Sequence, residues 1–394
     1  MKIGILGNMN NAYFALTRYL RDKGLDCELM IFENEPEHFD PSFDTNSSSY
    51  TRYCKKLTWG DPAGFLSQDF EKIRTDIEQY DVLIGNGPAP AYVSKVGRKL
   101  DIFMPYGYDL YSLPFVKVVH PLRQAAYLAT RRYQRRGIRE ADYILFDRTN
   151  KEFEKVFTQL HFAGRRIVCP SPMLYDQDYL DLPNHQPVGA VAGLQDLRES
   201  NDLVIVQNTR QVWKHSPDQW SDKGNDELFK GFKTFVDTYP HIRCKLVVFE
   251  YGNDVDNSKK LIADLQLTGH VLWLPKMARK ELMSVIAIAD LAVGELEYSW
   301  LTYGVVLEAL ALGKPLMHHR KDEEFISDYP ELYPMICAHD ASSVFKGLQQ
   351  LITSKEQVAA MGLQGRKWFE RYCVEFPLTI ITNILEQKKP LHHA

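Results

Sequence analysis

The sequence predicts an α/β protein built from two doubly wound domains. Short apolar runs rich in β-branched residues alternate with segments of helical apolar spacing along most of the chain. The pattern begins with a strand-like run at 2–6, a turn, and a helical segment at 12–20. The chain of 394 residues also exceeds the roughly 250 to 300 at which a single core stops growing. Each half is therefore expected to hold a parallel sheet covered by helices on both faces.

The N-terminal half contains six runs with the character of buried strands. Each run ends in turn or polar residues, and the six occupy 2–6, 26–32, 80–87, 101–107, 141–147 and 165–171. In such sheets the functional residues lie on loops at the carboxyl ends of the strands. The expected functional edge is therefore marked by Gly7, by 85–87 and by 107–109.

The second half repeats the pattern after a linker. Residues 181–201 are polar, contain Pro and Gly, and lack apolar periodicity. Strand-like runs then resume, at 203–210, 244–252, 270–275 and 289–295. The predicted domains are 1–185 and 186–375. A C-terminal segment, 376–394, is expected to pack back on the first domain.

The composition is that of an ordinary globular protein, with 45% hydrophobic and 25% charged residues. The formal net charge of −4 is small for this length and argues against a general nucleic-acid binder. Six scattered cysteines form no C-x-x-C pair, so we expect reduced thiols in a cytoplasmic protein. The N-terminus lacks the pattern of a signal peptide. No apolar run reaches the ~20 residues of a membrane span.

The loop after the first predicted strand is a candidate anion site. Gly7, Asn8, Asn10 and Asn11 lie where a loop opens a helix, and such a loop offers unpaired backbone N–H groups to phosphate. The GxGxxG dinucleotide fingerprint is missing, because only Gly4 and Gly7 are present. Two interpretations stay open: an acceptor or diphosphate loop, and a plain strand-loop-helix unit.

A lone carboxylate, Glu308, stands within an apolar run in residues 295–315, ELEYSWLTYGVVLEALALGKP. A helix beginning near Gly304 would end at Gly313, because glycine suits the C-cap and the following Pro315 cannot continue a helix. The residues expected to face inward are Val305, Leu307, Ala309, Leu310 and Leu312. Glu308 is then either a solvated residue on the helix flank or a buried functional group.

This stretch resembles a motif of the retaining GT-B glycosyltransferases, the large nucleotide-sugar-dependent group 1 or family 4 type. The family motif reads Glu-Gly-Phe-Gly-x-x-x-x-Glu-Ala-x-Ala-x-Gly-x-Pro. Its second half matches at Glu308, Ala309, Ala311, Gly313 and Pro315. The resemblance extends over nearly the whole chain and implies two Rossmann-like domains facing a central cleft, the GT-B fold.

The first half of the motif departs from the family pattern. Trp300 stands eight positions before Glu308, where the family has its first glutamate. Glu295 and Glu297 lie just upstream, and the sequence leaves open which of them replaces the missing carboxylate.

The resemblance implies a donor site at the start of this helix. A diphosphate is expected against the free N–H groups of Gly304 and Val305, where the helix dipole is positive. Glu308 would stand ~6 Å further along the helix and accept both ribose hydroxyls, as the family's second glutamate does. The other residues expected at this donor site are Thr302, Tyr303, Lys214 and Glu297.

The resemblance also implies cations on the loop after residues 203–210. The family places an arginine and a following Lys-Gly there to hold the diphosphate, and Arg210 and Lys223 match. With Glu295, they are expected among the catalytic residues, because paired cations stabilise charge that grows on the leaving phosphate. Lys214 is the rival of Lys223, and each cation could instead be a solvated surface residue. The scheme requires no metal or other cofactor, so metal-independent transfer is expected.

A second family motif, His-Gly-x-Asp, has a partial match in the N-terminal half. Tyr106 replaces the histidine, while Gly107 and Asp109 remain. The Tyr106 hydroxyl could hydrogen-bond the donor sugar, but its high pKa makes it a poor proton carrier. Asp109 could orient the acceptor hydroxyl as a catalytic residue or cap the next turn, and these alternatives stay open.

One local run of basic charge interrupts the balanced composition, at residues 117–142. It contains Arg123, Arg131, Arg132, Arg135, Arg136 and Arg139. Arginines interleaved with tyrosines are typical of a surface for anionic lipid or a phosphorylated acceptor, and equally of a solvated helix face. A nucleic-acid partner is disfavoured, because no nucleic-acid-binding motif accompanies the run.

The function implied by the resemblance is transfer of a sugar from a UDP- or GDP-sugar to a glycan or lipid-linked acceptor with retention of configuration. Cell-surface polysaccharide or glycoconjugate synthesis is the expected setting, in the cytoplasm or at the inner face of the membrane. Two alternatives remain: a sugar-nucleotide epimerase of the same architecture, and a catalytically silent sugar-binding subunit. Trp300 and Tyr106, which depart from the family pattern, make the silent subunit plausible.

Overall fold

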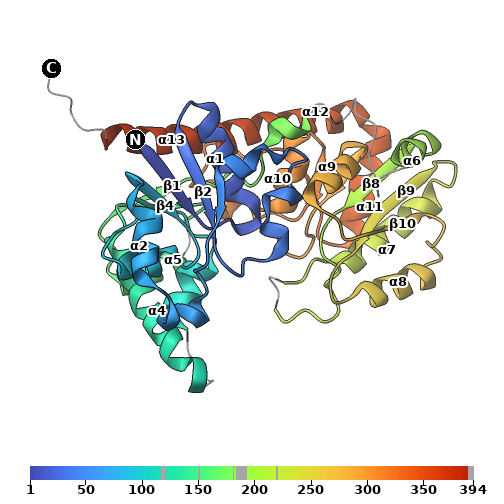
Figure 1. Ribbon diagram of the computed structural model, residues 1–394. Helices are drawn as coiled ribbons and strands as arrows, with labels where there is room; N and C mark the ends of the chain where they lie inside the picture. The colour runs from blue at the N-terminus through green and yellow to red at the C-terminus, as the bar shows by residue number, and fades with distance from the viewer. Residues whose placement is uncertain (117–120, 150, 181, 183–192, 219–220, 389–394) are drawn as a thin grey trace. The chain divides into compact units, whose positions relative to one another are not determined.

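The chain folds into two compact units in the computed structural model (Figure 1). The first comprises Met1–Tyr175 and Arg371–Ala394, and the second Asp176–Glu370. The structure describes residues 1–116, 121–149, 151–180, 182, 193–218 and 221–388, with only the backbone of 121–123. The predicted domain boundary at 185/186 lies outside the described residues and stays a prediction.

The first unit is built on a parallel sheet with the order β3-β2-β1-β4-β5-β6-β7. Its strands are β1 (Lys2–Leu6), β2 (Asp26–Ile31), β3 (Cys54–Lys56), β4 (Val82–Gly85), β5 (Ile102–Phe103), β6 (Tyr143–Phe146) and β7 (Arg165–Val168). The order reverses between β1 and β4, so the loops after these two strands lie side by side at the carboxyl edge. The short edge strand β3 was not predicted.

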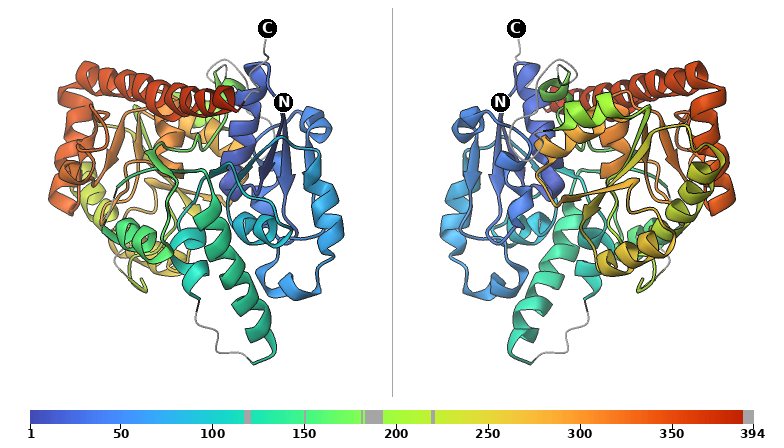
Figure 2. Two further views of the ribbon diagram at one scale, coloured as in Figure 1. Left: turned by 90° about the vertical axis from the view of Figure 1, so that its left-hand side faces the viewer. Right: turned by 90° about the vertical axis from the view of Figure 1, so that its right-hand side faces the viewer.

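Helices cover both faces of this sheet (Figure 2). They are α1 (Ala12–Asp22), α2 (Phe70–Glu78), α3 (Ala89–Lys95), α4 (Pro121–Glu140), α5 (Lys151–Leu160) and α13 (Phe376–Gln387). Successive strand residues alternate between two cores: Val82 and Ile84 join the side chains of α1 and α13, and Leu83 joins those of α2 to α5. This alternation explains why the strands read as continuous apolar runs.

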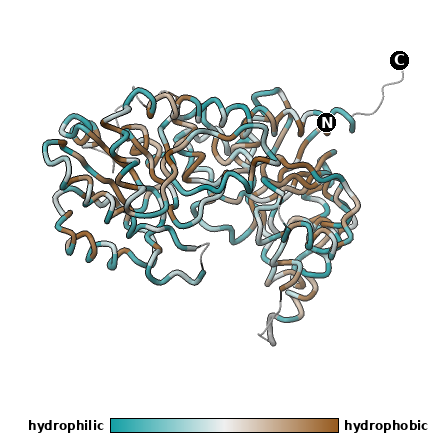
Figure 3. Tube along the Cα trace, turned by 180° about the vertical axis from the view of Figure 1, so that it is seen from behind, coloured by the Kyte–Doolittle hydropathy of each residue, from teal (hydrophilic) through white to brown (hydrophobic). Residues whose placement is uncertain are grey.

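The second unit has a parallel sheet with the order β10-β9-β8-β11-β12-β13. Its strands are β8 (Leu203–Gln207), β9 (Cys244–Glu250), β10 (Val271–Pro275), β11 (Leu291–Val293), β12 (Leu316–His318) and β13 (Ile336–Cys337). Its helices are α6 (Leu194–Ser200), α7 (Asn225–Thr238), α8 (Val255–Asp264), α9 (Arg279–Ala287), α10 (Gly304–Ala311), α11 (Ala341–Thr353) and α12 (Lys355–Trp368). The predicted α/β class with two doubly wound sheets is confirmed. Figure 3 shows hydrophobic residues concentrated along the strands of both units.

Helix α10 begins at Gly304 and ends before Gly313, as predicted. Gly313 has φ +65°, the left-handed conformation that favours glycine after a helix. The predicted inward face was partly wrong, because Val305 and Leu312 are only half-buried and Val306 is buried. The helix is apolar almost all round and lies within the core.

Candidate active site

The candidate site of the second unit lies where its strand order reverses. Strands β8 and β11 are neighbours, with Gln207 paired to Val293 at their carboxyl ends. The loop 208–224 follows β8, and the loop 294–303 follows β11. In open parallel sheets this is the place where ligands bind.

Lys223 and Glu295 meet at this place, one from each loop. The Lys223 Nζ lies 2.7 Å from Glu295 Oε1, with the side chains only 7% and 9% exposed. Burial raises the pKa of Glu295, while the positive charges of Lys223 and Arg210 lower it. Gly224 has φ +60°, and a Cβ there would lie 2.9 Å from the Leu296 Cβ. The Lys-Gly pair therefore lets the two loops approach closely.

The other two predicted cations occupy different positions. Arg210 is exposed and makes no hydrogen bond or ion pair within the described residues, although its charge acts on Glu295. Lys214 is also exposed, and its Nζ donates to Asn257 Oδ1 at 3.2 Å, beside helix α8. Of the two rival lysines, the structure brings Lys223 to Glu295.

Glu308 is buried at the base of the same site, with 6% of its surface exposed. Its Oε1 accepts from Arg279 Nε at 3.0 Å, and its Oε2 from Asn208 Nδ2 at 2.7 Å. The carboxylate turns back toward the start of its helix, since a Cβ on Gly304 would lie 3.8 Å from Oε1. The solvated alternative for Glu308 is therefore wrong.

Arg279 and Asn208 were missed from the sequence. Asn208 directly follows the end of β8, and Arg279 is the first residue of α9. Only their position in the sequence could have indicated them, because both residues lie in segments that follow parallel strands at the carboxyl edge of the sheet. A carboxylate has about four lone-pair sites, so Glu308 retains acceptor capacity beside its two partners.

The start of α10 has no side-chain cap. Its N-cap residue, Tyr303, has an extended backbone and makes no capping hydrogen bond. The Tyr303 hydroxyl instead accepts from the Glu295 backbone N–H at 3.0 Å and from Ser299 Oγ at 3.1 Å. Gly304 and Val305 are half-exposed, so their amides stand at a free positive helix end. Burial raises the pKa of Tyr303 well above its usual value, and its hydroxyl holds the loop in place.

The remaining residues of this loop differ in exposure. Glu297 is exposed, and its carbonyl lies 2.7 Å from the His319 Nδ1. The Trp300 ring packs edge-on against Tyr298, with centroids 4.8 Å apart. Thr302 is half-buried. Of the two carboxylates considered for the missing family glutamate, Glu295 is thus the buried one beside a cation.

Two Asp-x-Asp sequences occur, at 176–178 and 254–256, and the first aspartate of each is engaged within the protein. Asp254 Oδ2 accepts the backbone amides of Trp213, Lys214 and His215. Asp176 forms an ion pair with Arg366. Within the described part of the chain, no group of three or more His, Cys, Asp or Glu side chains is placed to hold a metal. Metal independence stays a prediction.

The predicted anion loop of the first unit is filled by protein groups. Gly7 has φ +90° and lies against Asn86. The Asn8 backbone N–H donates to Glu35 Oε1 at 2.9 Å, and its Oδ1 accepts from the Phe14 N–H at 2.9 Å. Asn11 is buried, and its Nδ2 donates to Asp44 Oδ1 at 2.9 Å.

Asn10, in the same loop, is half-exposed with φ +49°. The Asn8 amide, which a phosphate would use, already donates to the carboxylate of Glu35. This arrangement favours the plain strand-loop-helix unit.

Asp109 is fully buried beneath two loops. Its Oδ2 accepts from the Gly87 N–H at 2.8 Å, and its Oδ1 from the amides of Tyr106 and Gly107 at 3.1 Å each. Burial raises the pKa of Asp109 to about 7, although these three hydrogen bonds lower it. The geometry supports the turn-capping alternative and gives no support to contact with an acceptor. Tyr106 itself is 40% exposed.

The arginines of α4 are largely engaged within the first unit. Arg131 and Arg135 donate to the carbonyls of Val116 and Pro114, at 3.4 and 2.6 Å. Arg136 pairs with Glu140 at 2.8 Å, and Arg139 donates to the Leu160 carbonyl.

Arg132 is exposed, and the side chain of Arg123 lies outside the described residues. Much of the predicted cationic surface therefore serves local structure. No described helix is long and apolar enough to cross a membrane.

Comparison with known proteins agrees with this architecture. Residues 220–368 match the family model described as Glycosyl transferases group 1. No curated protein sequence matches the chain. A structure of Anabaena HepE in complex with UDP is similar at 14% identity, with a TM-score of 0.63 and coverage of 98% of this chain and 100% of that chain.

Two further solved structures are similar over their whole length. A glycosyltransferase from Rickettsia africae is 12% identical, with a TM-score of 0.60 and 99% of each chain covered. S. aureus MnaA, solved with UDP, is 12% identical, with a TM-score of 0.57 and coverage of 98% of this chain and 96% of that chain. At these identities the likeness shows the fold, which is the GT-B fold expected from the sequence.

Proposed function

We propose that this chain moves a sugar from a nucleotide diphosphate sugar to an acceptor, because residues 220–368 match the family model described as Glycosyl transferases group 1. The donor is a UDP- or GDP-sugar, bound by the second unit. UDP is the first nucleotide to test, because it is present in the similar HepE and MnaA structures.

The observation that carries the proposal is the position of Glu308. Its side chain is buried, and the carboxylate turns back toward the uncapped start of α10, at the edge where the strand order reverses. A ligand with phosphates at one end and two hydroxyls at the other fits this arrangement: the amides of Gly304 and Val305 attract the phosphates, and the carboxylate accepts from the hydroxyls. Asn208 and Arg279 hold that carboxylate in place.

Arg210 and Lys223 are the proposed cations for the leaving group. The bond between the anomeric carbon and the phosphate oxygen breaks, and its electron pair stays on the nucleotide diphosphate. The acceptor oxygen forms the new bond on the same face, and its proton passes to the leaving phosphate oxygen. The two cations and the helix amides stabilise the charge that develops. Because attack and departure share one face, the product keeps the donor's configuration.

We propose that the first unit supplies the acceptor site and that the acceptor is a glycan or a lipid-linked saccharide. Tyr106 is half-exposed at the carboxyl edge of that unit and can hydrogen-bond a sugar. The setting is cell-surface polysaccharide or glycoconjugate synthesis, in the cytoplasm or at the inner face of a membrane. The scheme needs no metal and no cofactor beyond the donor.

The deciding experiment is calorimetric titration of the full chain with UDP and GDP, followed by incubation with UDP-glucose and other nucleotide sugars without acceptor. Binding of one nucleotide and slow release of nucleotide from its sugar are expected. An isomerised, uncleaved donor seen by mass spectrometry and NMR would indicate the epimerase instead. Tight binding with no turnover in the presence of an acceptor panel would indicate the silent subunit. The absence of binding by any nucleotide or nucleotide sugar would contradict the proposal.

A further inference from the structure

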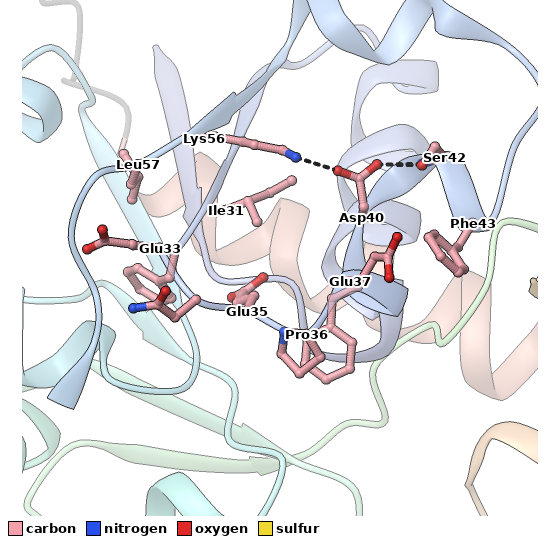
Figure 4. A pocket seen from close by; sticks show the side chains of 13 residues that line it. Ile31, Glu33, Glu35, Pro36, Glu37, Asp40, Ser42, Phe43, Lys56 and Leu57 are labelled. Carbon is pink, nitrogen blue, oxygen red and sulfur yellow. Dashed lines mark hydrogen bonds and ion pairs between the residues drawn. The ribbon is translucent and has the colours of Figure 1, made fainter. Parts of the chain in front are cut away.

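Two cavities flank the segment 32–36 of the first unit, which follows strand β2. One, of about 480 Å³, is drawn in Figure 4 and is bounded by Glu35, Glu37, Asp40 and Lys56. The other, of about 300 Å³, extends toward Asn86, Gly87 and Tyr106. This second cavity borders the loops after β1 and β4, where the strand order of the first unit reverses. Ligands of open parallel sheets bind at that edge.

Glu35 lines both cavities and has an unused acceptor. Its Oε1 accepts from the Asn8 backbone N–H at 2.9 Å. Its Oε2 is buried and makes no hydrogen bond within the described residues. A buried polar atom without a partner is costly, so a hydrogen-bond donor arriving in the cavity would remove that cost.

Three tyrosines belong to the wall of the smaller cavity. Tyr106 and Tyr108 are 40% and 47% exposed, and Tyr127 of α4 lies half-buried beside them. Partly exposed aromatic side chains in the same cavity as a hydrogen-bonding carboxylate suit a sugar ring, which has apolar C–H faces and hydroxyl edges.

The charged side chains that line this cavity disfavour anions. Its described lining contains the carboxylates of Glu33, Glu35 and Asp61 and no lysine or arginine. In the neighbouring cavity Lys56 is already paired with Asp40 at 2.8 Å. A phosphate or carboxylate group would therefore enter a field of like charge without a compensating cation.

We propose that the smaller cavity binds a terminal sugar ring of the acceptor that carries no anionic group, and that Glu35 is the residue that selects it. Oε2 accepts a hydrogen bond from the ring, and Tyr106 and Tyr108 pack on its faces. The assignment of this sugar as acceptor rests on the proposed transferase function, whereas its binding does not. On this proposal the arginines of helix α4 do not bind the sugar, although Tyr127 of that helix lines the cavity.

Saturation-transfer NMR on the full chain tests this proposal. The probes are glucose, N-acetylglucosamine and glucosamine, each compared with glucose 6-phosphate and glucuronate. Transfer is expected from one or more of the first three and not from the two anions. At about pH 8, above the raised pKa of Glu35, Glu35→Gln replaces a charged acceptor by a neutral amide, so it should lower the affinity about tenfold. The exposed Glu37, which lines only the other cavity, supplies the matched control Glu37→Gln, with no change expected.

Three results would overturn the proposal: no transfer from any of the uncharged or cationic sugars, equal binding of the anions, or full affinity in Glu35→Gln. If thermal unfolding shows that Glu35→Gln is not folded, Tyr108→Ala takes its place, since Tyr108 is exposed and its loss should weaken binding in the same way. UDP titration of the same samples separates the two hypotheses. Nucleotide binding without sugar binding refutes the cavity alone, and sugar binding without nucleotide binding refutes the proposed donor site.

Discussion

Lys223 and Glu295 form an ion pair of 2.7 Å between two loops that are 72 residues apart in the chain, and both side chains are buried. The carboxylate holds the ammonium group beside Arg210, at the point where the strand order reverses. The backbone of the same lysine is fixed as well, because its carbonyl accepts from the Leu296 N–H at 3.0 Å. The pair therefore holds the Lys223 ammonium group in place and keeps the two loops together at this edge of the sheet.

The first prediction concerns the stability of this pair. Lys223→Ala should lower the free energy of unfolding of the second unit by about 3 to 5 kcal/mol, because it leaves Glu295 buried without its partner. Urea unfolding followed by tryptophan fluorescence measures the change. Lys214→Ala is the matched control, since that lysine is exposed. Equal effects of the two substitutions would mean that the buried pair has no structural role.

The second prediction concerns Glu308 and the donor. Glu308→Gln should weaken nucleotide binding about tenfold, because charge-assisted hydrogen bonds to the ribose become neutral ones. Calorimetry with the nucleotide measures this loss, and Glu199→Gln, at an exposed position of α6 outside this site, should bind normally. Unchanged affinity in a folded Glu308→Gln would remove Glu308 from the donor site.

The sequence predicted the longer elements and the main carboxylate, but not the residues that surround it. The start of α10 at Gly304 and its end before Gly313 followed from local chemistry. Strands β3, β12 and β13 were missed, although β5 and β11 are equally short and were predicted. The difference is that β5 and β11 lie within longer apolar runs of the sequence, which carry the strand signal.

Asn208 and Arg279 were missed because they are 100 and 29 residues from their partner Glu308 in the chain. Only the sheet order places them together. Asp109 shows the opposite case: the motif was visible, but its three amide partners and its burial depend on loop packing.

The third prediction concerns pH and Glu35. Burial raises the pKa of this carboxyl from 4.5 to about 7, so between these values the folded state holds a proton that the unfolded state releases. The stabilisation is complete below the unfolded pKa and is lost as pH rises through the folded one. Glu35→Gln does not titrate, so the stability of the variant relative to the native chain should rise by up to roughly 3 kcal/mol between about pH 5 and pH 8.

Denaturant unfolding at both pH values measures this difference, with Glu37→Gln as the exposed control. A pH-independent difference for Glu35→Gln would show that the carboxyl titrates in the folded chain as it does in water.

The fourth prediction concerns α4 and membranes. We expect the chain to bind anionic liposomes weakly, because Arg131, Arg135 and Arg136 already have protein partners. Arg132→Gln should make the free energy of liposome binding less favourable by about 1 kcal/mol, which is the contribution of one basic residue near an anionic surface. Sedimentation with phosphatidylserine vesicles at two salt concentrations measures this. Strong, salt-sensitive binding that survives Arg132→Gln would place the membrane surface elsewhere on the chain.

The last prediction joins Arg210 to the stereochemistry of transfer. Arg210 is exposed beside the buried pair of Lys223 and Glu295, and no ion pair within the described residues occupies it. It is therefore available to a phosphate whose charge grows as the sugar leaves. Arg210→Ala should lower the turnover rate about a hundred- to thousandfold, equivalent to about 2.7 to 4 kcal/mol, and weaken ground-state donor binding much less.

Lys214→Ala is the control for a nearby exposed cation and should keep most of the rate. NMR spectra of the first product, recorded before mutarotation, show the configuration at the anomeric carbon of the transferred sugar. Retention together with a loss of rate confined to Arg210→Ala is the expected result, because the leaving phosphate stays on the face that the acceptor attacks. An inverted product would exclude that geometry, and full activity of Arg210→Ala would leave Lys223 and the amides of α10 as the groups that stabilise the departing nucleotide.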